Sequence, residues 1–150
     1  MVTILCVAKL KVSVNVPLDP ETAWAHASDL ADYDKWLSIH EGWRSDLPEQ
    51  LSVGTTLESV ATVKGLRNRV RWTIETYDPP KKLKLKGSGK GGVKIGLVLS
   101  VTAGKSGGSD LALDIELGGA PLFGPIGSGV ARALKGDIEN SMKTFESLYA

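Results

Sequence analysis

The side chains best suited to acid–base or metal chemistry in this chain are the two histidines, His26 and His40. Neither has a cysteine or carboxylate at the spacing that zinc ligands take, so we expect no metal. The Gly-x-Ser-x-Gly pattern of Gly104–Gly108 leads into a predicted strand and not into the helix of a nucleophile elbow, and we expect no catalytic residue and no cofactor. His40 and Arg44 follow Trp36 closely, and they could polarise a ligand oxygen at the mouth of a pocket. The alternative is a surface histidine beside a solvated arginine.

Two glycine-rich segments, Gly87–Gly92 and Gly104–Ser106, superficially resemble phosphate-binding loops. Such a loop begins with a glycine several residues before its lysine, and it leads into a helix. For Lys105, the position of that first glycine is occupied by Leu99. Strand-like alternation follows both segments instead. We therefore interpret them as hairpin turns, which argues against nucleotide binding.

Positive charge is concentrated in residues 64–105, which hold 11 basic and 2 acidic side chains, whereas both flanking segments are net acidic. Five of these cations are predicted to share the outward face of two adjacent strands: Arg69, Arg71, Lys82, Lys84 and Lys86. This basic face could meet nucleic acid, anionic lipid headgroups or an acidic protein. Nucleic acid is disfavoured because no aromatic residue interleaves the charges. The alternative is a solvated face whose lysines discourage edge pairing.

The elements that position these side chains follow from the alternation of apolar and polar residues, which predicts strands with one buried face. The connections are too short for parallel crossovers, so we expect an antiparallel sheet. The predicted strands are Lys9–Pro17, Ile39–Asp46, Thr56–Lys64, Arg67–Tyr77, Lys82–Lys86, Val93–Ala103 and Asp110–Leu117.

Three helices are predicted beside this sheet. Asp19 as N-cap and proline at the next position indicate a short helix over Pro20–Ser28. Asp29 can cap a second short helix over residues 31–37. Apolar residues three or four apart predict a long amphipathic helix from about Leu122 to Tyr149, about 42 Å in length.

The length of 150 residues fits one domain, residues 1–150, with a substantial core. Cys6 is the single cysteine, so no internal disulfide can form and nothing requires an oxidising compartment. No apolar run reaches the roughly 18 residues that a membrane span needs, and the first residues lack the features of a signal peptide. We therefore expect a cytoplasmic protein with no membrane span.

The predicted sheet is too wide for one helix to cover. Seven strands at about 4.8 Å spacing extend roughly 34 Å, whereas a helix with its side chains is about 10–12 Å wide. The sheet must curl around the long helix, and a pocket of about 300–1,000 Å³ is typical of ligand-binding interiors. The alternative is a core packed solid by its own side chains. The predicted apolar lining comprises Trp36, Leu57, Trp72, Ile74, Leu83, Leu85, Ile95, Leu97, Leu99, Leu113, Ile115, Phe123, Ile126, Val130, Leu134 and Ile138.

The order of a strand, two short helices, six antiparallel strands and a long helix resembles the START-like (SRPBCC) superfamily, which includes the birch-pollen allergen, steroidogenic lipid-transfer domains and polyketide cyclases. Val16–His40 is similar to the strand-to-helix entry of that superfamily. Four segments further resemble an actinobacterial subgroup identified as the toxin half of type II toxin–antitoxin pairs: Trp43–Glu49, Val63–Ile74, Gly91–Lys94 and Leu117–Gly127. The resemblance covers about Ala8 to the end. It implies an α+β helix-grip fold, in which a curved seven-stranded antiparallel sheet wraps around the C-terminal helix.

Residues 1–7 precede the point where that subgroup begins. One hypothesis is that translation starts at the codon for Val7, because the N-terminal extension has no obvious partner strand. A first strand that simply starts early is the alternative.

Three functions remain open from the sequence. The resemblance implies that the protein binds a hydrophobic small molecule or lipid between sheet and helix, as the toxin-like component of a pair with a cognate antitoxin as partner. A polyketide cyclase or aromatase is the alternative, but the predicted inward strand positions are nearly all Val, Leu, Ile or Trp and leave few groups for acid–base work. An interaction module that uses the basic face is the third.

Overall fold

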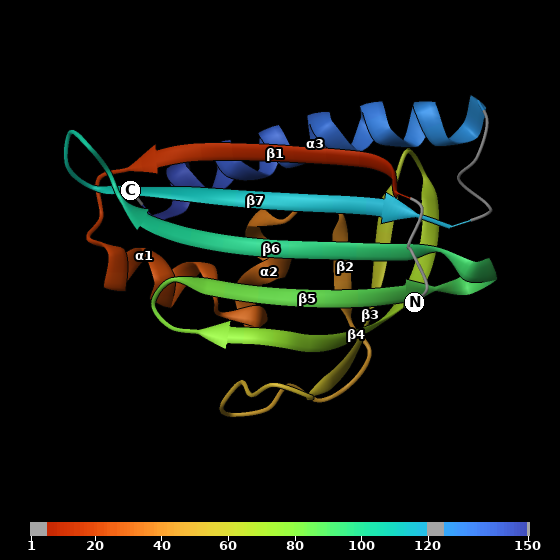
Figure 1. Ribbon diagram of the computed structural model, residues 1–150, viewed down its shortest axis with the longest axis horizontal. Helices are drawn as coiled ribbons and strands as arrows, with labels where there is room; N and C mark the ends of the chain where they lie inside the picture. The colour runs from red at the N-terminus through yellow and green to blue at the C-terminus, as the bar shows by residue number, and fades with distance from the viewer. Residues whose placement is uncertain (1–5, 120–124, 150) are drawn as a thin grey trace.

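The computed structural model describes residues 6–119 and 125–149, which form a seven-stranded antiparallel sheet with three α-helices (Figure 1). The long helix α3 lies behind β1 in this view. The strands are β1 (Cys6–Val16), β2 (His40–Trp43), β3 (Thr56–Val63), β4 (Leu66–Asp78), β5 (Lys82–Gly89), β6 (Lys94–Ala103) and β7 (Ser109–Gly118). The helices are α1 (Pro20–Ala27), α2 (Tyr33–Trp36) and α3 (Pro125–Tyr149), with 3₁₀ turns η1 (Leu30–Asp32) and η2 (Lys90–Gly92).

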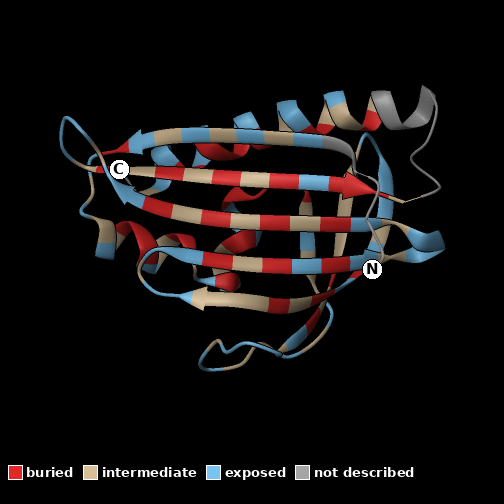
Figure 2. Cartoon of the chain, in the orientation of Figure 1, coloured by how far each residue is buried: buried red, intermediate tan, exposed pale blue. Residues whose placement is uncertain are grey.

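The strand order is β1-β7-β6-β5-β4-β3-β2, and each neighbouring pair is antiparallel. Buried side chains alternate with more exposed ones along β5, β6 and β7 (Figure 2), because successive residues of a strand point to opposite faces. The inner face packs against the helices and forms the core. The predicted fold class is therefore confirmed.

Strand β5 is longer than the sequence predicted, and the expected turn over Gly87–Gly92 is confined to η2. The reason is a close approach on the inner face. A Cβ atom on Gly87 would lie 2.7 Å from Val70 Cγ1 and 2.8 Å from both Ile95 Cγ2 and Trp72 Cε3. Glycine therefore continues the strand at this position because it leaves room for three large neighbours.

The two short helices follow β1. In α1 the carboxylate of Asp19 accepts a hydrogen bond from the backbone N–H of Thr22 at 3.2 Å, as expected for an N-cap. The predicted second helix is divided into two parts, because residues 30–36 consist of the 3₁₀ turn η1 and the four-residue α2. β1 begins at Cys6, which pairs with Gly118. Residues 1–5 lie outside the described part, and the hypothesis of a start at Val7 stays a prediction.

Helix α3 contacts β1, β3 and α2 across the open side of the sheet. Its predicted start at Leu122 lies outside the described residues. Buried residues three or four positions apart face the sheet: Val130, Leu134, Ile138, Met142 and Phe145. This spacing places one apolar stripe of the helix in the core. Among the described helices, none is long and apolar enough to cross a membrane.

Candidate ligand-binding interior

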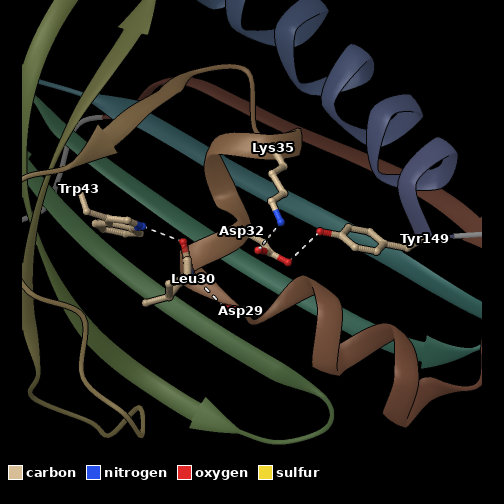
Figure 3. A network of polar contacts seen from close by, with 7 residues as sticks. Asp29, Leu30, Asp32, Lys35, Trp43 and Tyr149 are labelled. Atoms are coloured by element: carbon tan, nitrogen blue, oxygen red, sulfur yellow. Dashed lines mark hydrogen bonds and ion pairs between the residues drawn. The ribbon is translucent and has the colours of Figure 1, made fainter.

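The segment η1–α2 forms one wall of the interior, and polar contacts hold it in place (Figure 3). The indole Nε1 of Trp43 in β2 donates to the carbonyl oxygen of Leu30 at 2.7 Å. On the other side, the Tyr149 hydroxyl at the end of α3 donates to Asp32 Oδ2 at 3.1 Å, and Lys35 Nζ lies 3.1 Å from Asp32 Oδ1. The hydrogen bond from Lys35 lowers the pKa of Asp32, whereas burial raises the pKa of Tyr149 to about 12. The tyrosine therefore remains a donor at neutral pH, and the wall is tied to both β2 and α3.

A void of ≈ 20 Å³ lies where this wall meets the inner face of the sheet. A space of this size holds about one water molecule. Most of its surface is apolar, but hydroxyl, imidazole and indole groups also reach it. Its lining residues are Tyr33, Leu37, Ile39, His40, Trp43, Ser59, Ala61, Trp72, Leu85 and Leu97.

Several polar atoms at or near the void are buried. Trp72 Nε1 donates to Ser59 Oγ at 2.8 Å. In contrast, the Tyr33 hydroxyl, Trp36 Nε1 and His40 Nε2 are buried without a hydrogen-bond partner among the described residues. An unpaired buried polar group costs about 1–3 kcal/mol, so such groups normally have partners. Tyr33 and His40 border the void, whereas Trp36 lines neither the void nor the hollow described below.

Burial also determines the charge of two of these groups. It raises the pKa of the Tyr33 hydroxyl far above its ordinary value, and the charge of Asp29 adds to this. It lowers the pKa of His40, against the opposing effect of Asp34. Both side chains are therefore neutral at pH 7. Tyr33 offers an O–H donor, and His40 offers one donor and one acceptor nitrogen.

A second, more open hollow of ≈ 220 Å³ lies between the β3–β4 hairpin, η2 and the first turns of α3. Ala61 lines both this hollow and the small void. Its lining is mostly apolar and comprises Ala61, Val63, Leu66, Arg67, Asn68, Val70, Lys90, Val93, Ile95, Leu117 and Val130. This space is smaller than the expected 300–1,000 Å³. Aromatic side chains take up part of the interior: Trp36 and Phe145 pack edge to face with ring centroids 5.2 Å apart.

The predicted apolar lining is buried wherever the structure describes it. These buried residues are Trp36, Leu57, Trp72, Ile74, Leu83, Leu85, Ile95, Leu97, Leu99, Leu113, Ile115, Val130, Leu134 and Ile138. Trp72, Leu85 and Leu97 border the void, and Ile95 and Val130 border the hollow. The others border neither space and belong to the core. Their role in binding stays a prediction.

Phe123 and the side chain of Ile126 lie outside the described residues. The sequence interpretation missed Tyr33, Ser59 and Ala61 as lining residues. The sequence did contain a signal for Ser59 and Ala61. They lie two and four residues after Leu57 on β3, so their side chains must point to the same inner face as Leu57. Tyr33 lies three residues before Trp36, a spacing that places both on one side of a helical segment.

His40 and Arg44 were predicted at the mouth of a pocket, and only His40 lines one of the two spaces described above. His40 borders the interior void, with its ring centroid 4.7 Å from that of Trp43. Arg44 is exposed and lines neither the void nor the hollow. Among the described residues, no group of three or more His, Cys, Asp or Glu side chains could hold a metal ion.

The predicted basic face lies on the outer side of the sheet, away from the interior. The register places Arg69, Arg71, Lys82, Lys84 and Lys86 on outward positions of β4 and β5. Two of the five cations have acidic partners: Arg69 Nη2 lies 3.1 Å from Glu58 Oε2, and Lys84 Nζ lies 3.9 Å from Glu75 Oε1. The positive charge is therefore partly neutralised on this face.

A family model described as polyketide cyclase/dehydrase and lipid transport matches residues 7–149. The chain belongs to this polyketide cyclase/dehydrase family. Two members from Mycobacterium tuberculosis are similar along almost their whole length. The chain is 52% identical over 143 residues to a protein named toxin Rv0910 and 51% identical over 142 residues to uncharacterized protein Rv1546, in each case over 95% of this chain and 99% of the relative.

Solved structures support the START-like fold of this polyketide cyclase/dehydrase family member. A START superfamily protein from Mycobacterium smegmatis aligns with a TM-score of 0.73 at 16% identity, over 94% of this chain and 96% of that one. The Zhui aromatase/cyclase from Streptomyces aligns with a TM-score of 0.74 at 9% identity, over 94% and 92%. At these identities the likeness concerns the fold alone. The predicted resemblance to the START-like superfamily and its toxin-named subgroup is confirmed.

Proposed function

We propose that the protein binds an apolar small molecule or lipid between the sheet and α3, and that this guest carries a hydrogen-bonding group. The observation that supports the proposal most directly is an apolar hollow that shares Ala61 with a void, which is bordered by polar atoms of Tyr33 and His40 that have no partner among the described residues. Apolar surface favours a hydrocarbon body. The Tyr33 hydroxyl and the imidazole of His40 favour a carbonyl or hydroxyl on the guest, which would replace the single water that the void can hold.

The guest must be small or must displace side chains as it enters. The hollow of ≈ 220 Å³ is below the range of about 300–1,000 Å³ that is typical of pockets for drug-sized ligands. Its rim includes Val63 and Val93, which are half-buried, whereas the inner core residues are fully buried. We propose that entry occurs at this rim, because moving half-buried side chains breaks fewer contacts than opening the core.

A matched pair of substitutions on β3 tests the proposal. Ala61→Phe fills the junction of the hollow and the void, whereas Val60→Phe adds an aromatic ring to the outer face, where residue 60 is paired with Arg69. Native mass spectrometry of protein from its own host should show an apolar guest on the wild type and on Val60→Phe, but not on Ala61→Phe. Tryptophan fluorescence should respond to the same guest because Trp72 borders the void. The absence of any guest, together with no response to lipids, sterols or aromatic polyketides, would contradict the proposal.

Catalysis is the second candidate. Tyr33, His40 and Ser59 border the void, so polar groups lie beside the nearly all-apolar inward strand positions that the sequence predicted. The sequence interpretation disfavoured a cyclase because such groups were not expected. Mass analysis of the guest before and after incubation with fresh protein distinguishes the two functions: binding leaves the mass unchanged, whereas a cyclase with dehydratase activity removes water.

We also propose that the protein acts in growth control together with an antitoxin-like partner. The support is the identity of 52% with a protein named a toxin. Expression of the chain in its host should slow growth, and co-expression of the neighbouring gene should relieve the effect. Unimpaired growth at a verified protein level would contradict this role. Expression of Ala61→Phe shows whether the effect depends on the interior.

A further inference from the structure

The outer face of the sheet carries two adjoining depressions, of ≈ 170 Å³ and ≈ 520 Å³, on the side opposite the helices. Both are lined by Glu75, Lys86 and Lys94. Arg71 lines the larger one. Arg71, Lys86 and Lys94 form no ion pair among the described residues, although Arg69 and Lys84 beside them do. The two depressions, together called the outer hollow below, therefore hold three cations that have no counterion in the described part of the chain.

The register of three strands brings these cations together. Arg71 is paired with Ser88, and Ser88 is paired in turn with Lys94. The arginine and the lysine therefore lie on either side of one serine, and neighbouring strands are about 4.8 Å apart. Lys86 lies two residues from Ser88 on the same face of β5, roughly 7 Å along the strand, and is paired with Thr73. Long arginine and lysine side chains can converge over this distance. Two hydroxyl groups and three cations thus surround the hollow.

The two acidic side chains that line the depressions already have partners. Glu75 Oε1 lies 3.9 Å from Lys84 Nζ, and Glu116 Oε1 lies 3.2 Å from Lys9 Nζ. Each carboxylate is therefore matched by a lysine other than Lys86 or Lys94. The excess charge of the hollow is positive, and exposed charges of one sign without counterions attract anions.

Gly96 supplies the floor of the smaller depression. It is the third residue of β6 and is paired with Lys86 on one side and Glu116 on the other. A Cβ atom on Gly96 would meet only Glu116 Cβ, at 3.9 Å, so open space lies above the backbone there. The lining of both depressions contains no aromatic side chain on which a nucleic-acid base could stack. The shape and chemistry suit a compact anion rather than a nucleic-acid strand.

We propose that this outer hollow binds the phosphate group of a small phosphorylated molecule. A phosphate monoester carries about −1.5 to −2 charges and three acceptor oxygens, which matches three cations and two hydroxyls better than a carboxylate does. Arg71, Lys86 and Lys94 would hold the oxygens, and Ser88 and Thr73 would donate from their hydroxyls. The site lies on the opposite face of the sheet from the interior and is independent of the guest proposed above.

Inorganic pyrophosphate is a suitable probe, and NMR of the ¹⁵N-labelled full chain reports where it binds. Amide signals of residues 86–88 and 94–96 should shift in a saturable way, whereas those of α3 should not. Acetate at equal ionic strength should leave all of these signals in place. Pyrophosphate shifts spread evenly over every exposed lysine would overturn the proposal.

Lys86→Gln and Lys82→Gln form a matched pair, because both residues are exposed lysines on the outer face of β5 but Lys82 lines neither depression. Lys86→Gln should raise the Kd for pyrophosphate at least ~fivefold, as expected when one of three charge-assisted contacts is lost. Lys82→Gln should change the Kd by less than about twofold, since it removes a charge outside the hollow. Equal effects of the two substitutions would mean diffuse attraction and would overturn the proposal.

Gly96→Val tests the shape of the hollow without changing any charge. Its side chain would fill the floor, so binding of pyrophosphate should fall ~fivefold or more while the fold is retained, as judged from the remaining amide signals. Unchanged binding would overturn the proposal. Tighter binding of an RNA oligonucleotide or of anionic phospholipid vesicles, unaffected by Gly96→Val, would assign the charge to a macromolecular partner and would also overturn it.

Discussion

The Tyr33 hydroxyl and His40 Nε2 are polar atoms in a largely apolar interior, and each lacks a partner among the described residues. Neither was predicted to line the interior by hydropathy, because tyrosine and histidine occur both inside and outside proteins. Their neighbours decide their chemistry. Ser59 and Trp72, which satisfy one another at 2.8 Å, show what a completed pair looks like in the same region.

A pair of tyrosine substitutions tests whether the Tyr33 hydroxyl is unpaired. Tyr149→Phe removes the donor to Asp32 and should lower the free energy of unfolding by about 0.5–1.5 kcal/mol. Tyr33→Phe removes a hydroxyl without a protein partner, so the free energy of unfolding should stay constant or rise. Urea denaturation measures both. A loss in Tyr33→Phe as large as that in Tyr149→Phe would mean that the hydroxyl has a partner such as an ordered water.

The buried imidazole predicts a dependence of stability on pH. Burial lowers the pKa of His40 in the folded protein below its ordinary value of 6.5, so the unfolded chain binds the proton more readily. The stability that neutral His40 contributes should therefore be complete above about pH 6.5. It should be lost as the pH falls toward the lower pKa that His40 has in the folded protein. Urea denaturation between about pH 5.5 and 7.5 tests this, because the carboxylates titrate mainly at lower pH. A slope that persists in His40→Gln would assign the effect to another group.

At the scale of elements, local pattern was sufficient for most of the strands and for the ends of α1. The second helix and β5 differ from their predictions because contacts distant in sequence decide their lengths. The segment η1–α2 is held by Trp43 and Tyr149, and β5 continues through Gly87 because Val70 and Trp72 pack over it. Neither contact leaves a signal in the segment itself.

Two glycine-to-alanine substitutions on adjacent central strands should have different effects. Gly87→Ala places a Cβ atom 2.7–2.8 Å from three core side chains and should lower the free energy of unfolding by about 1–3 kcal/mol. Gly96→Ala points into open space on the outer face and should be neutral or slightly stabilising, since glycine is a poor strand residue. Thermal or urea unfolding compares them directly. Equal losses would show that the inner approach at residue 87 is not as close as described.

At the scale of the whole molecule, sheet and helix enclose less space than their widths suggested. Large aromatic residues fill part of the interior, where the structure places a water-sized void and a hollow of ≈ 220 Å³. The two faces of the sheet also differ in their polar groups. Tyr33, His40 and Ser59 border the interior void, whereas Arg71, Lys86 and Lys94 face outward. The two proposed sites therefore lie on opposite faces of one sheet.

A guest in the interior should stabilise the folded state by mass action. At a free concentration of one hundred times its Kd, an apolar guest should add about 2.7 kcal/mol to the free energy of unfolding. Differential scanning calorimetry should show a concentration-dependent rise in Tm for the wild type and for Val60→Phe, but none for Ala61→Phe. An equal rise in all three proteins would place the guest outside the hollow.

The sequence by itself determined which residues form strands and helices, which faces are buried and which face carries the basic residues. These properties are local, because periods of 2 and 3.6 residues are set by backbone geometry. Only the tertiary structure decided that Tyr33, His40 and Ser59 border one void, that this void is water-sized, and that Arg71, Lys86 and Lys94 have no acidic partner in residues 6–119 and 125–149. Such features depend on side chains that meet from distant segments and on packing within a few tenths of an ångström, which no local pattern encodes.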